Sequence, residues 1–267
     1  MNTFGMKVKA RCFIEYDSVA DLVDIEFEEL ARPVLHIGGG SNLLFTDDFK
    51  GTVLHSKIDF IEILDECHRI PEAPAFASSG TSYPVNHPKN PQIFGDPEKV
   101  GKCLLHTNGT SPEDSNASSK HYLASAEGQR ITPSLIRKVI IGIRKEKLPE
   151  PSVMGSAGSF FKNPVISMEH FQKIEAAAKA ECGPDCRVPH YDLPDGTVKV
   201  PAAWMIEQCG WKGRRSGGAA VWEKQPLVIV NYTGEAYPEE IIGLERRIIA
   251  SVKEKFNIEL HPEVEHI

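Results

Sequence analysis

Pro149-Glu-Pro-Ser-Val-Met-Gly-Ser-Ala-Gly-Ser-Phe-Phe-Lys-Asn-Pro164 is the stretch around which the rest of this sequence can be arranged. It places Ser159 behind a run of small residues at 155–158 and ahead of two phenylalanines. Small residues let a backbone approach a ligand closely, so the stretch has the character of a binding site. An ordinary turn followed by two core phenylalanines explains the same residues equally well. The surrounding sequence has to decide between these two interpretations.

A predicted helix ends directly before this stretch. Pro133 suits the first position of a helix, and apolar residues then recur at helical spacing. Pro149 ends the pattern, which places Arg144 and Lys147 in the last turn, next to the Ser159 stretch. Cations beside a candidate site suit an anionic ligand, but they are also common at helix C-termini because they complement the helix dipole.

A glycine-rich turn follows a predicted strand, residues 33–37, in the N-terminal part of the chain. We call this turn the glycine loop; it consists of Gly38, Gly39, Gly40, Ser41 and Asn42. Such a turn lets consecutive backbone N–H groups face an anion such as a pyrophosphate. Leu43 stands where the dinucleotide-binding fingerprint needs a third glycine, and no Gly-Lys-Ser/Thr follows, so neither a Rossmann fold nor a nucleotide-hydrolase loop is indicated. A tight structural turn is the alternative.

Strands and helices alternate along the chain without a uniform repeat, which predicts an α+β fold in two parts. With 267 residues and 41% hydrophobic content, the chain is long enough for two modest domains. We expect further strands at residues 11–16, 51–54, 58–63, 165–166 and 227–230, and further helices at 19–30, 168–180, 201–209 and from 238 onward. Residues 68–119 are rich in proline, serine and asparagine with little apolar periodicity, which predicts a long loop or a disordered linker.

Composition excludes several classes of partner. Acidic side chains outnumber basic ones by 37 to 30, the net charge is −7, and no Lys/Arg cluster resembles a phosphate-tracking stripe, so we expect no nucleic-acid partner. No apolar run approaches the ~18 residues of a membrane span, and the N-terminus lacks a signal-peptide pattern. These observations predict a soluble, cytoplasmic protein, which we expect to be monomeric.

The six cysteines are scattered, which in a chain without an export signal favours reduced thiols over a disulfide framework. Cys182, Cys186 and His190 form the one cluster that has to be weighed as a metal site. Because the Cys-x3-Cys spacing is irregular and a fourth ligand would have to come from Asp185 or Asp192, a loop after a helix is the favoured interpretation. We therefore predict no metal ion.

Seven motifs carry a resemblance to a known family. They are Asn-Thr-Phe-Gly at 2–5, Ile-Gly-Gly-Gly-Ser-Asn-Leu-Leu at 37–44, Lys-Leu-Pro-Glu-Pro at 147–151, Gly-Ser-Ala-Gly-Ser-Phe-Phe-Lys-Asn-Pro at 155–164, Ala-Ala-Trp-Met-Ile-Glu-Gln-Cys-Gly-Trp-Lys-Gly at 202–213, Gly-Gly-Ala-Ala-Val at 217–221 and Pro-Glu-Val at 262–264. Together and in this order they resemble the UDP-N-acetylenolpyruvoylglucosamine reductases, flavoenzymes of bacterial peptidoglycan precursor synthesis. The resemblance covers residues 2–64 and 131–267.

The resemblance implies the activity and the roles of the site residues. Members of the family pass hydride from NADPH to bound FAD, and then from the reduced flavin to the enolpyruvyl double bond, which yields UDP-N-acetylmuramate. By resemblance, Ser159 is the proton donor and Glu263 is its acidic companion. The glycine loop approaches the FAD pyrophosphate, and the residues placed around the substrate and its diphosphate are Lys147, Asn163 and Lys212.

The resemblance also divides the chain. It implies an N-terminal FAD-binding part at 1–64, an atypical segment at 65–130, a linking helix at 131–150, a substrate-binding domain at 151–256 and a C-terminal segment at 257–267 that returns to the site. The family's middle region, with its second glycine-rich stretch and its Tyr-Arg-x-Ser segment, has no counterpart, because residues 68–129 are shorter and no Tyr-Arg pair occurs. A UDP-sugar-binding protein of the same family with impaired catalysis is therefore the alternative to an active reductase.

Overall fold

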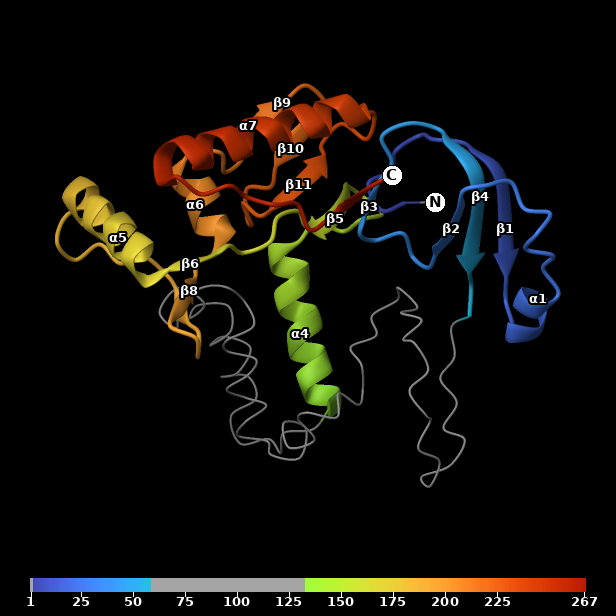
Figure 1. Cartoon of the computed structure of the whole chain (residues 1–267), viewed down its shortest axis with the longest axis horizontal. Coiled ribbons are helices and arrows are strands. Elements are labelled where there is room, and N and C mark those ends of the chain that lie inside the picture. The colour runs from blue at the N-terminus through green and yellow to red at the C-terminus, as the bar shows by residue number, and fades with distance from the viewer. Residues whose placement is uncertain (1, 59–132) are drawn as a thin grey trace.

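The protein is described by a computed structural model over residues 2–58 and 133–267, and the predicted mixture of helices and strands is confirmed. Figure 1 shows two groups of elements, one built on each of the larger sheets. The helices and strands are β1 (Ala10–Tyr16), α1 (Val19–Val23), β2 (Val34–Ile37), β3 (Leu43–Leu44), β4 (Phe49–Ser56), α4 (Pro133–Lys147), β5 (Gly155–Ser159), β6 (Val165–Ser167), α5 (Met168–Cys182), β7 (Tyr191–Asp192), β8 (Thr197–Lys199), α6 (Ala202–Gln208), β9 (Arg215–Ser216), β10 (Ala219–Val221), β11 (Val228–Asn231), α7 (Pro238–Phe256) and β12 (Glu265–His266).

The N-terminal sheet has three parallel strands in the order β1-β4-β2 (Figure 1). Its central strand β4 buries Val53 and Leu54, and it carries a glycine, Gly51, where it passes the neighbouring chain. A Cβ atom at Gly51 would lie 1.8 Å from the carbonyl oxygen of Pro33, so only glycine permits this close approach. The sheet leads directly into the glycine loop, which follows β2.

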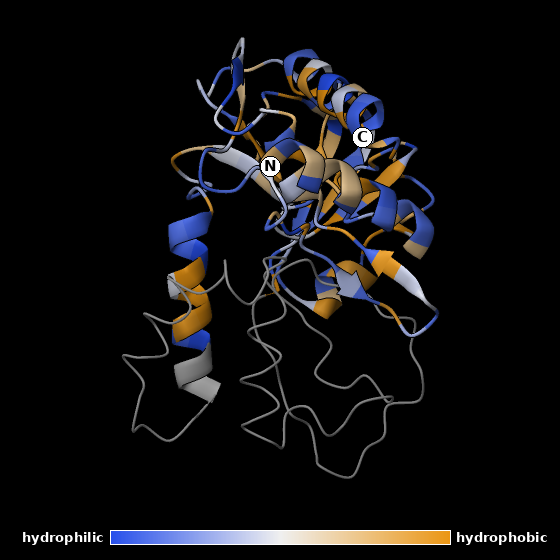
Figure 2. Cartoon of the chain, turned by 90° about the vertical axis from the view of Figure 1, so that its left-hand side faces the viewer, coloured by the Kyte–Doolittle hydropathy of each residue, from blue (hydrophilic) through white to orange (hydrophobic). Residues whose placement is uncertain are grey.

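The C-terminal sheet has four antiparallel strands in the order β5-β11-β10-β9, and helix α7 packs against it (Figure 1). Apolar residues on α7 recur every three or four positions, and those that face the sheet are fully buried: Ile241, Leu244, Ile248 and Val252. Figure 2 shows α7 coloured on one side as hydrophobic and on the other as hydrophilic. This helix and sheet form the main hydrophobic core, to which α5, α6 and β8 add further side chains.

The helix predicted at residues 19–30 is much shorter, because α1 ends at Val23. The side chain of Ser18 and that of Asp21 form a reciprocal capping box at its start, and the predicted start at residue 19 is confirmed. The helix buries no residue against the rest of the protein, and Asp24 and Glu28 would repel each other one turn apart. Without packing, a good cap does not extend a helix.

The other predicted helices begin and end within a few residues of their expected positions, as do the predicted strands among the described residues. The strands β3, β5, β9, β10 and β12 were not predicted. Gly210 ends the α6 region with a positive φ of 72°, as a residue after a helix C-terminus should. The strand predicted at 58–63 and the segment predicted at 65–130 lie outside the described residues. None of the described helices is both long enough and apolar enough to cross a membrane.

Candidate active site

Ser159 is the last residue of β5, and its side chain is exposed to solvent. β5 pairs with β11 in the middle of the C-terminal core, with Ser159 opposite Val228. The two phenylalanines that follow turn inward, since Phe160 is 0% and Phe161 is 1% exposed. The prediction that the phenylalanines are core residues is therefore confirmed, and the role of the exposed Ser159 in a binding site stays a prediction.

The end of the chain runs along the segment that follows Ser159, which places Glu263 opposite Phe160, the residue after the serine. The N–H of Glu263 donates to the carbonyl of Phe160 at 2.8 Å, and Pro262 forms an antiparallel bridge with Phe161. The N–H of Lys162 donates to the carbonyl of His261 at 2.9 Å, so the two segments are joined on both sides of the bridge. The side chain of Glu263 is exposed, like that of Ser159.

The same C-terminal segment joins the glycine loop. Asn42 donates its side-chain N–H to the carbonyl of Glu263 at 3.1 Å, and its own carbonyl accepts from the N–H of Glu265 at 3.0 Å. β12 then pairs in parallel with β3, directly after the loop. The structure thus brings together three predicted site elements that are far apart in sequence: the glycine loop, Ser159 and Glu263.

The N-terminal segment makes a second connection between the loop and β5. The N–H of Thr3 donates to the carbonyl of Gly40 at 3.2 Å, and the carbonyl of Thr3 accepts from the N–H of Ser156 at 2.9 Å. Phe4 is fully buried and packs edge-to-face on Phe160. One residue, Thr3, therefore bonds to the glycine loop on one side and to the strand of Ser159 on the other.

A cavity of about 440 Å³ opens between these elements. The glycine loop contributes Ser41 and Asn42, β5 contributes Ser156, Ala157 and Gly158, and the N-terminal segment contributes Thr3, whereas Ser159 and Glu263 are not part of the lining. The remaining wall is the end of α4 and the turn after it: Ile141, Arg144, Lys145, Leu148, Pro149, Glu150 and Pro151. The guanidinium of Arg144 and the ammonium of Lys145 form no ion pair with a described carboxylate, so the cavity has positive charge available for an anionic ligand.

The three predicted substrate residues are placed differently. Lys147 lies at the end of α4, where its carbonyl accepts from the indole N–H of Trp222 at 3.0 Å, but it does not line this cavity. The amide oxygen of Asn163 accepts from the N–H of Ala202 at 2.9 Å and so caps the start of α6. Lys212 forms an ion pair with Glu207 at 2.6 Å and also lies away from the cavity lining. Their substrate-binding roles stay predictions.

Sequence reasoning missed Thr3 as a site residue and attached no role to Lys145. The Asn-Thr-Phe-Gly motif marked the N-terminal segment, but nothing in it indicated that the segment bonds to Gly40 and Ser156. Arg144 had been noted beside the Ser159 stretch, where its position in the last turn of a helix had a simpler explanation. For Lys145, helical spacing from Ile141 and Leu148 was the one available signal.

The alternative metal cluster is not assembled. Across residues 2–58 and 133–267, no three His, Cys, Asp or Glu side chains are arranged to hold a metal ion. His190 packs its ring on Phe171 and bonds through Nδ1 to the carbonyl of Val188 at 2.9 Å. A hydrogen bond with the Cys182 thiol raises the pKa of the Cys186 thiol, the opposite of what a thiolate ligand needs. Another cavity of about 500 Å³, between α5 and the ends of α6 and α7, is lined by Cys182 but by none of the predicted site residues.

The architecture and the site define an α+β protein with a cationic, loop-lined cavity beside an exposed serine and glutamate. A family model described as the C-terminal domain of UDP-N-acetylenolpyruvoylglucosamine reductase matches residues 150–267. The UDP-N-acetylenolpyruvoylglucosamine reductase of Bacteroides fragilis is 34% identical over an alignment that covers 100% of this chain and 97% of that protein. The enzyme of the same name from Porphyromonas gingivalis is 32% identical, with 100% and 96% covered. The chain therefore belongs to the UDP-N-acetylenolpyruvoylglucosamine reductase family.

Two further comparisons show how the similarity is distributed. The reductase of Burkholderia vietnamiensis is 48% identical over 132 residues, which are 49% of this chain and 36% of that protein. The crystal structure of the reductase from Thermus caldophilus matches with a TM-score of 0.47 at 17% identity, covering 99% of this chain and 95% of that one. The alignment with the Bacteroides fragilis enzyme spans 330 positions while the chain has 267 residues, so at least 63 of those positions are gaps in this chain.

Proposed function

We propose that this protein reduces UDP-N-acetylenolpyruvoylglucosamine to UDP-N-acetylmuramate in peptidoglycan precursor synthesis, with FAD as bound cofactor and NADPH as reductant. The observation that carries the proposal is the joining of Ser159, Glu263 and the glycine loop by the C-terminal segment. The similarity to reductases along the whole chain supports the same activity, and nothing in the described structure favours the alternative of a protein that only binds a UDP-sugar.

The described residues fit one part of FAD, its diphosphate. Ser41 and Asn42 offer hydroxyl and amide donors to the cavity, and Gly40 has a positive φ of 60°, which lets the loop turn without a side chain. Arg144 and Lys145 supply positive charge on the opposite wall. When bound, FAD would supply the hydride chemistry. We assign no described residue to the flavin ring.

The protein's own part in the reaction is proton transfer and charge stabilisation. Adding hydride to the enolpyruvyl double bond leaves negative charge on the substrate's carboxylate side, and a proton must be added to the neighbouring carbon. The exposed hydroxyl of Ser159 is the donor, and Glu263, exposed on the neighbouring C-terminal segment opposite Phe160, is its acidic companion. A serine is a weak acid in water, so the site has to stabilise the developing charge with fixed cations and dipoles.

Absorption and turnover measurements test the proposal. Purified protein mixed with FAD and then separated from free cofactor should retain the visible flavin bands, and it should oxidise NADPH only when the enolpyruvyl substrate is present. Ser159→Ala should slow substrate reduction by about 10²–10⁴-fold while NADPH still reduces the flavin at the wild-type rate. A protein that retains no flavin, or an alanine variant that slows both half-reactions equally, would contradict the assignment.

A further inference from the structure

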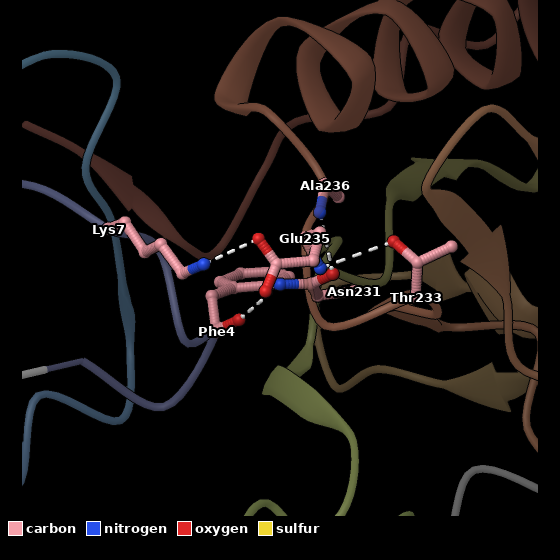
Figure 3. Close-up of polar contacts among 6 residues, drawn as sticks. All are labelled: Phe4, Lys7, Asn231, Thr233, Glu235 and Ala236. Atoms are coloured by element: carbon pink, nitrogen blue, oxygen red, sulfur yellow. Dashed lines mark hydrogen bonds and ion pairs between the residues drawn. The ribbon is translucent and has the colours of Figure 1, made fainter.

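The backbone carbonyl of Phe4 is held where the N-terminal segment meets the C-terminal sheet (Figure 3). The side-chain N–H of Asn231, at the end of β11, donates to this carbonyl at 3.0 Å. Asn231 lies opposite Gly155 in the β5–β11 pair, and a Cβ atom on Gly155 would come within 2.1 Å of the same carbonyl oxygen. The glycine leaves room for the Phe4 carbonyl, and the asparagine binds it.

The other end of the Asn231 amide is also occupied. Its oxygen accepts from the N–H of Ala236 at 3.0 Å, in the turn that leads to α7 (Figure 3). Asn231 is 2% exposed, so both hydrogen bonds are shielded from water. A carbonyl on one side and an N–H on the other admit only one orientation of the amide, which makes Asn231 a rigid connection.

This connection continues into the candidate site through Thr3, the residue that precedes Phe4. Thr3 makes the other two bonds: its carbonyl accepts from the N–H of Ser156 and its N–H donates to Gly40, so holding Phe4 restricts the short backbone segment that carries both. The path from Asn231 to the glycine loop therefore consists of two adjacent residues, Phe4 and Thr3, and two hydrogen bonds, and a third bond joins Thr3 to Ser156 on β5. The exposed ion pair of Lys7 with Glu235 lies next to the Asn231–Phe4 hydrogen bond (Figure 3).

We propose that Asn231 is a positioning residue: through Phe4 and Thr3 it sets the glycine loop at a fixed place relative to the strand that carries Ser159. It touches neither substrate nor cofactor in this scheme. The consequence for FAD affinity rests on the proposed function, since it assumes that the glycine loop binds the cofactor diphosphate. The coupling between Asn231, Ser156 and Gly40 does not depend on that assumption.

Asn231→Asp is the sharpest variant, because it keeps an oxygen for Ala236 but turns the donor that faces Phe4 into an acceptor. We expect the amide hydrogens of Thr3 and Ser156 to exchange with solvent about tenfold faster, as measured by NMR, while amides in the buried turns of α7 keep their wild-type rates. FAD affinity, followed by visible absorption, should fall by about tenfold. Asn257→Asp, the same chemical change at the exposed end of α7, is the matched control and should alter neither quantity.

Two results would overturn the proposal. One is a wild-type exchange rate at Ser156 in the variant; the other is an equal increase at Ser156 and throughout α7, which would indicate global destabilisation alone. If Asn231→Asp does not fold, Asn231→Ser removes the same bond without a charge and should give the same local pattern. The exchange measurement uses no cofactor, so it decides the coupling even if the wild-type protein binds no flavin, a result that would instead contradict the proposed function.

Discussion

The N-terminal sheet β1-β4-β2 and the C-terminal sheet β5-β11-β10-β9 differ in how well their surroundings cover them. In the C-terminal group, one face of α7 is fully buried, and Phe160, Phe161 and the neighbouring strands complete a continuous core. Around the N-terminal sheet, Phe13 is 44% exposed and Val23 on α1 is 75% exposed. The better-covered half is also the one matched by the family model.

This difference in burial indicates that the C-terminal group can hold the N-terminal glycine loop in place. The C-terminal group can keep β5 rigid by its own packing, whereas the glycine loop depends for its position on bonds to Thr3 and Glu263 and on the pairing of β12 with β3. The site therefore consists of a rigid strand and a loop fastened to it. We therefore expect substitutions to cost most stability in the C-terminal core, less in the contacts that join the two groups and least in the less covered N-terminal group.

Truncation in the C-terminal core should have the largest effect. Ile248→Ala removes a fully buried side chain from α7 and should lower the free energy of unfolding by about 2–5 kcal/mol, because it leaves a cavity in close-packed surroundings. Val23→Ala in α1 should change it by less than about 0.5 kcal/mol, since that side chain is mostly exposed. Urea unfolding of both variants checks the contrast, and equal effects would refute the difference between the two halves.

Removing a contact between the C-terminal segment and α7 should cost an intermediate amount of stability. His266 on β12 bonds through Nε2 to the buried carboxylate of Glu245 on α7 at 2.9 Å. His266→Ala leaves that carboxylate without this partner and should cost about 1–3 kcal/mol. It should also weaken the pairing of β12 with β3, which amide exchange at Leu44 would report. His261→Ala, an exposed position on the same segment, is the control and should leave Leu44 unchanged.

The sequence predicted those elements whose signals are local. Pro133, Pro238 and Gly210 mark helix ends by their own backbone preferences, and the apolar spacing of α7 shows its buried face. The helix predicted at 19–30 failed because its continuation depended on packing that no local pattern reports. Burial by distant elements is the information that a single stretch of sequence lacks.

The site residues also fall into those with a local sequence signal and those whose roles depend on distant partners. Ser159 and the glycine loop stand out by composition, since small residues and turns serve close approach wherever they occur. The role of Thr3 depends on Gly40, 37 positions away, and that of Asn231 depends on Phe4, 227 positions away. An isolated threonine or asparagine carries no signal of such a partner, so these residues could be recognised only from the folded chain.

Carboxylates in the first turns of α7 and α1 allow the stability of the two halves to be compared at acid pH. Glu240 in α7 accepts from the N–H groups of Gly218 and Tyr237, and these bonds lower the pKa of its carboxyl group. The folded state therefore binds this proton less readily than the unfolded state, so the stabilisation is present at neutral pH and is lost as the pH falls below about 4.3. Glu240→Gln leaves one oxygen to accept from two N–H groups, so it should lower stability at pH 7 by less than about 1 kcal/mol and reduce the dependence on pH in that acid range.

Asp21 in α1 is the matched cap in the other half. Hydrogen bonds from Ser18 and from the backbone of Asp17 lower the pKa of the Asp21 carboxyl group. Because α1 buries no side chain, Asp21→Asn should fray that helix without changing global unfolding. Thermal unfolding at pH 3–7 for both variants separates these outcomes, and an equal loss of stability in the two would show that α1 is part of the cooperative core.

The smallest loss of stability is expected for the exposed ion pair between the N-terminal segment and the turn before α7. Lys7 pairs with Glu235 directly beside the buried Asn231–Phe4 bond, but the two side chains are 74% and 68% exposed. Water and salt screen such a pair, and holding two long side chains together costs entropy, so Lys7→Ala should change the free energy of unfolding by less than about 1 kcal/mol. Any effect should disappear in 1 M salt, whereas the effect of Asn231→Asp should persist, because the hydrogen bonds of Asn231 are buried. Unfolding measured at low and high salt decides this; a large, salt-independent loss for Lys7→Ala would mean that the exposed contact, and not the buried amide, holds the N-terminal segment to the C-terminal sheet.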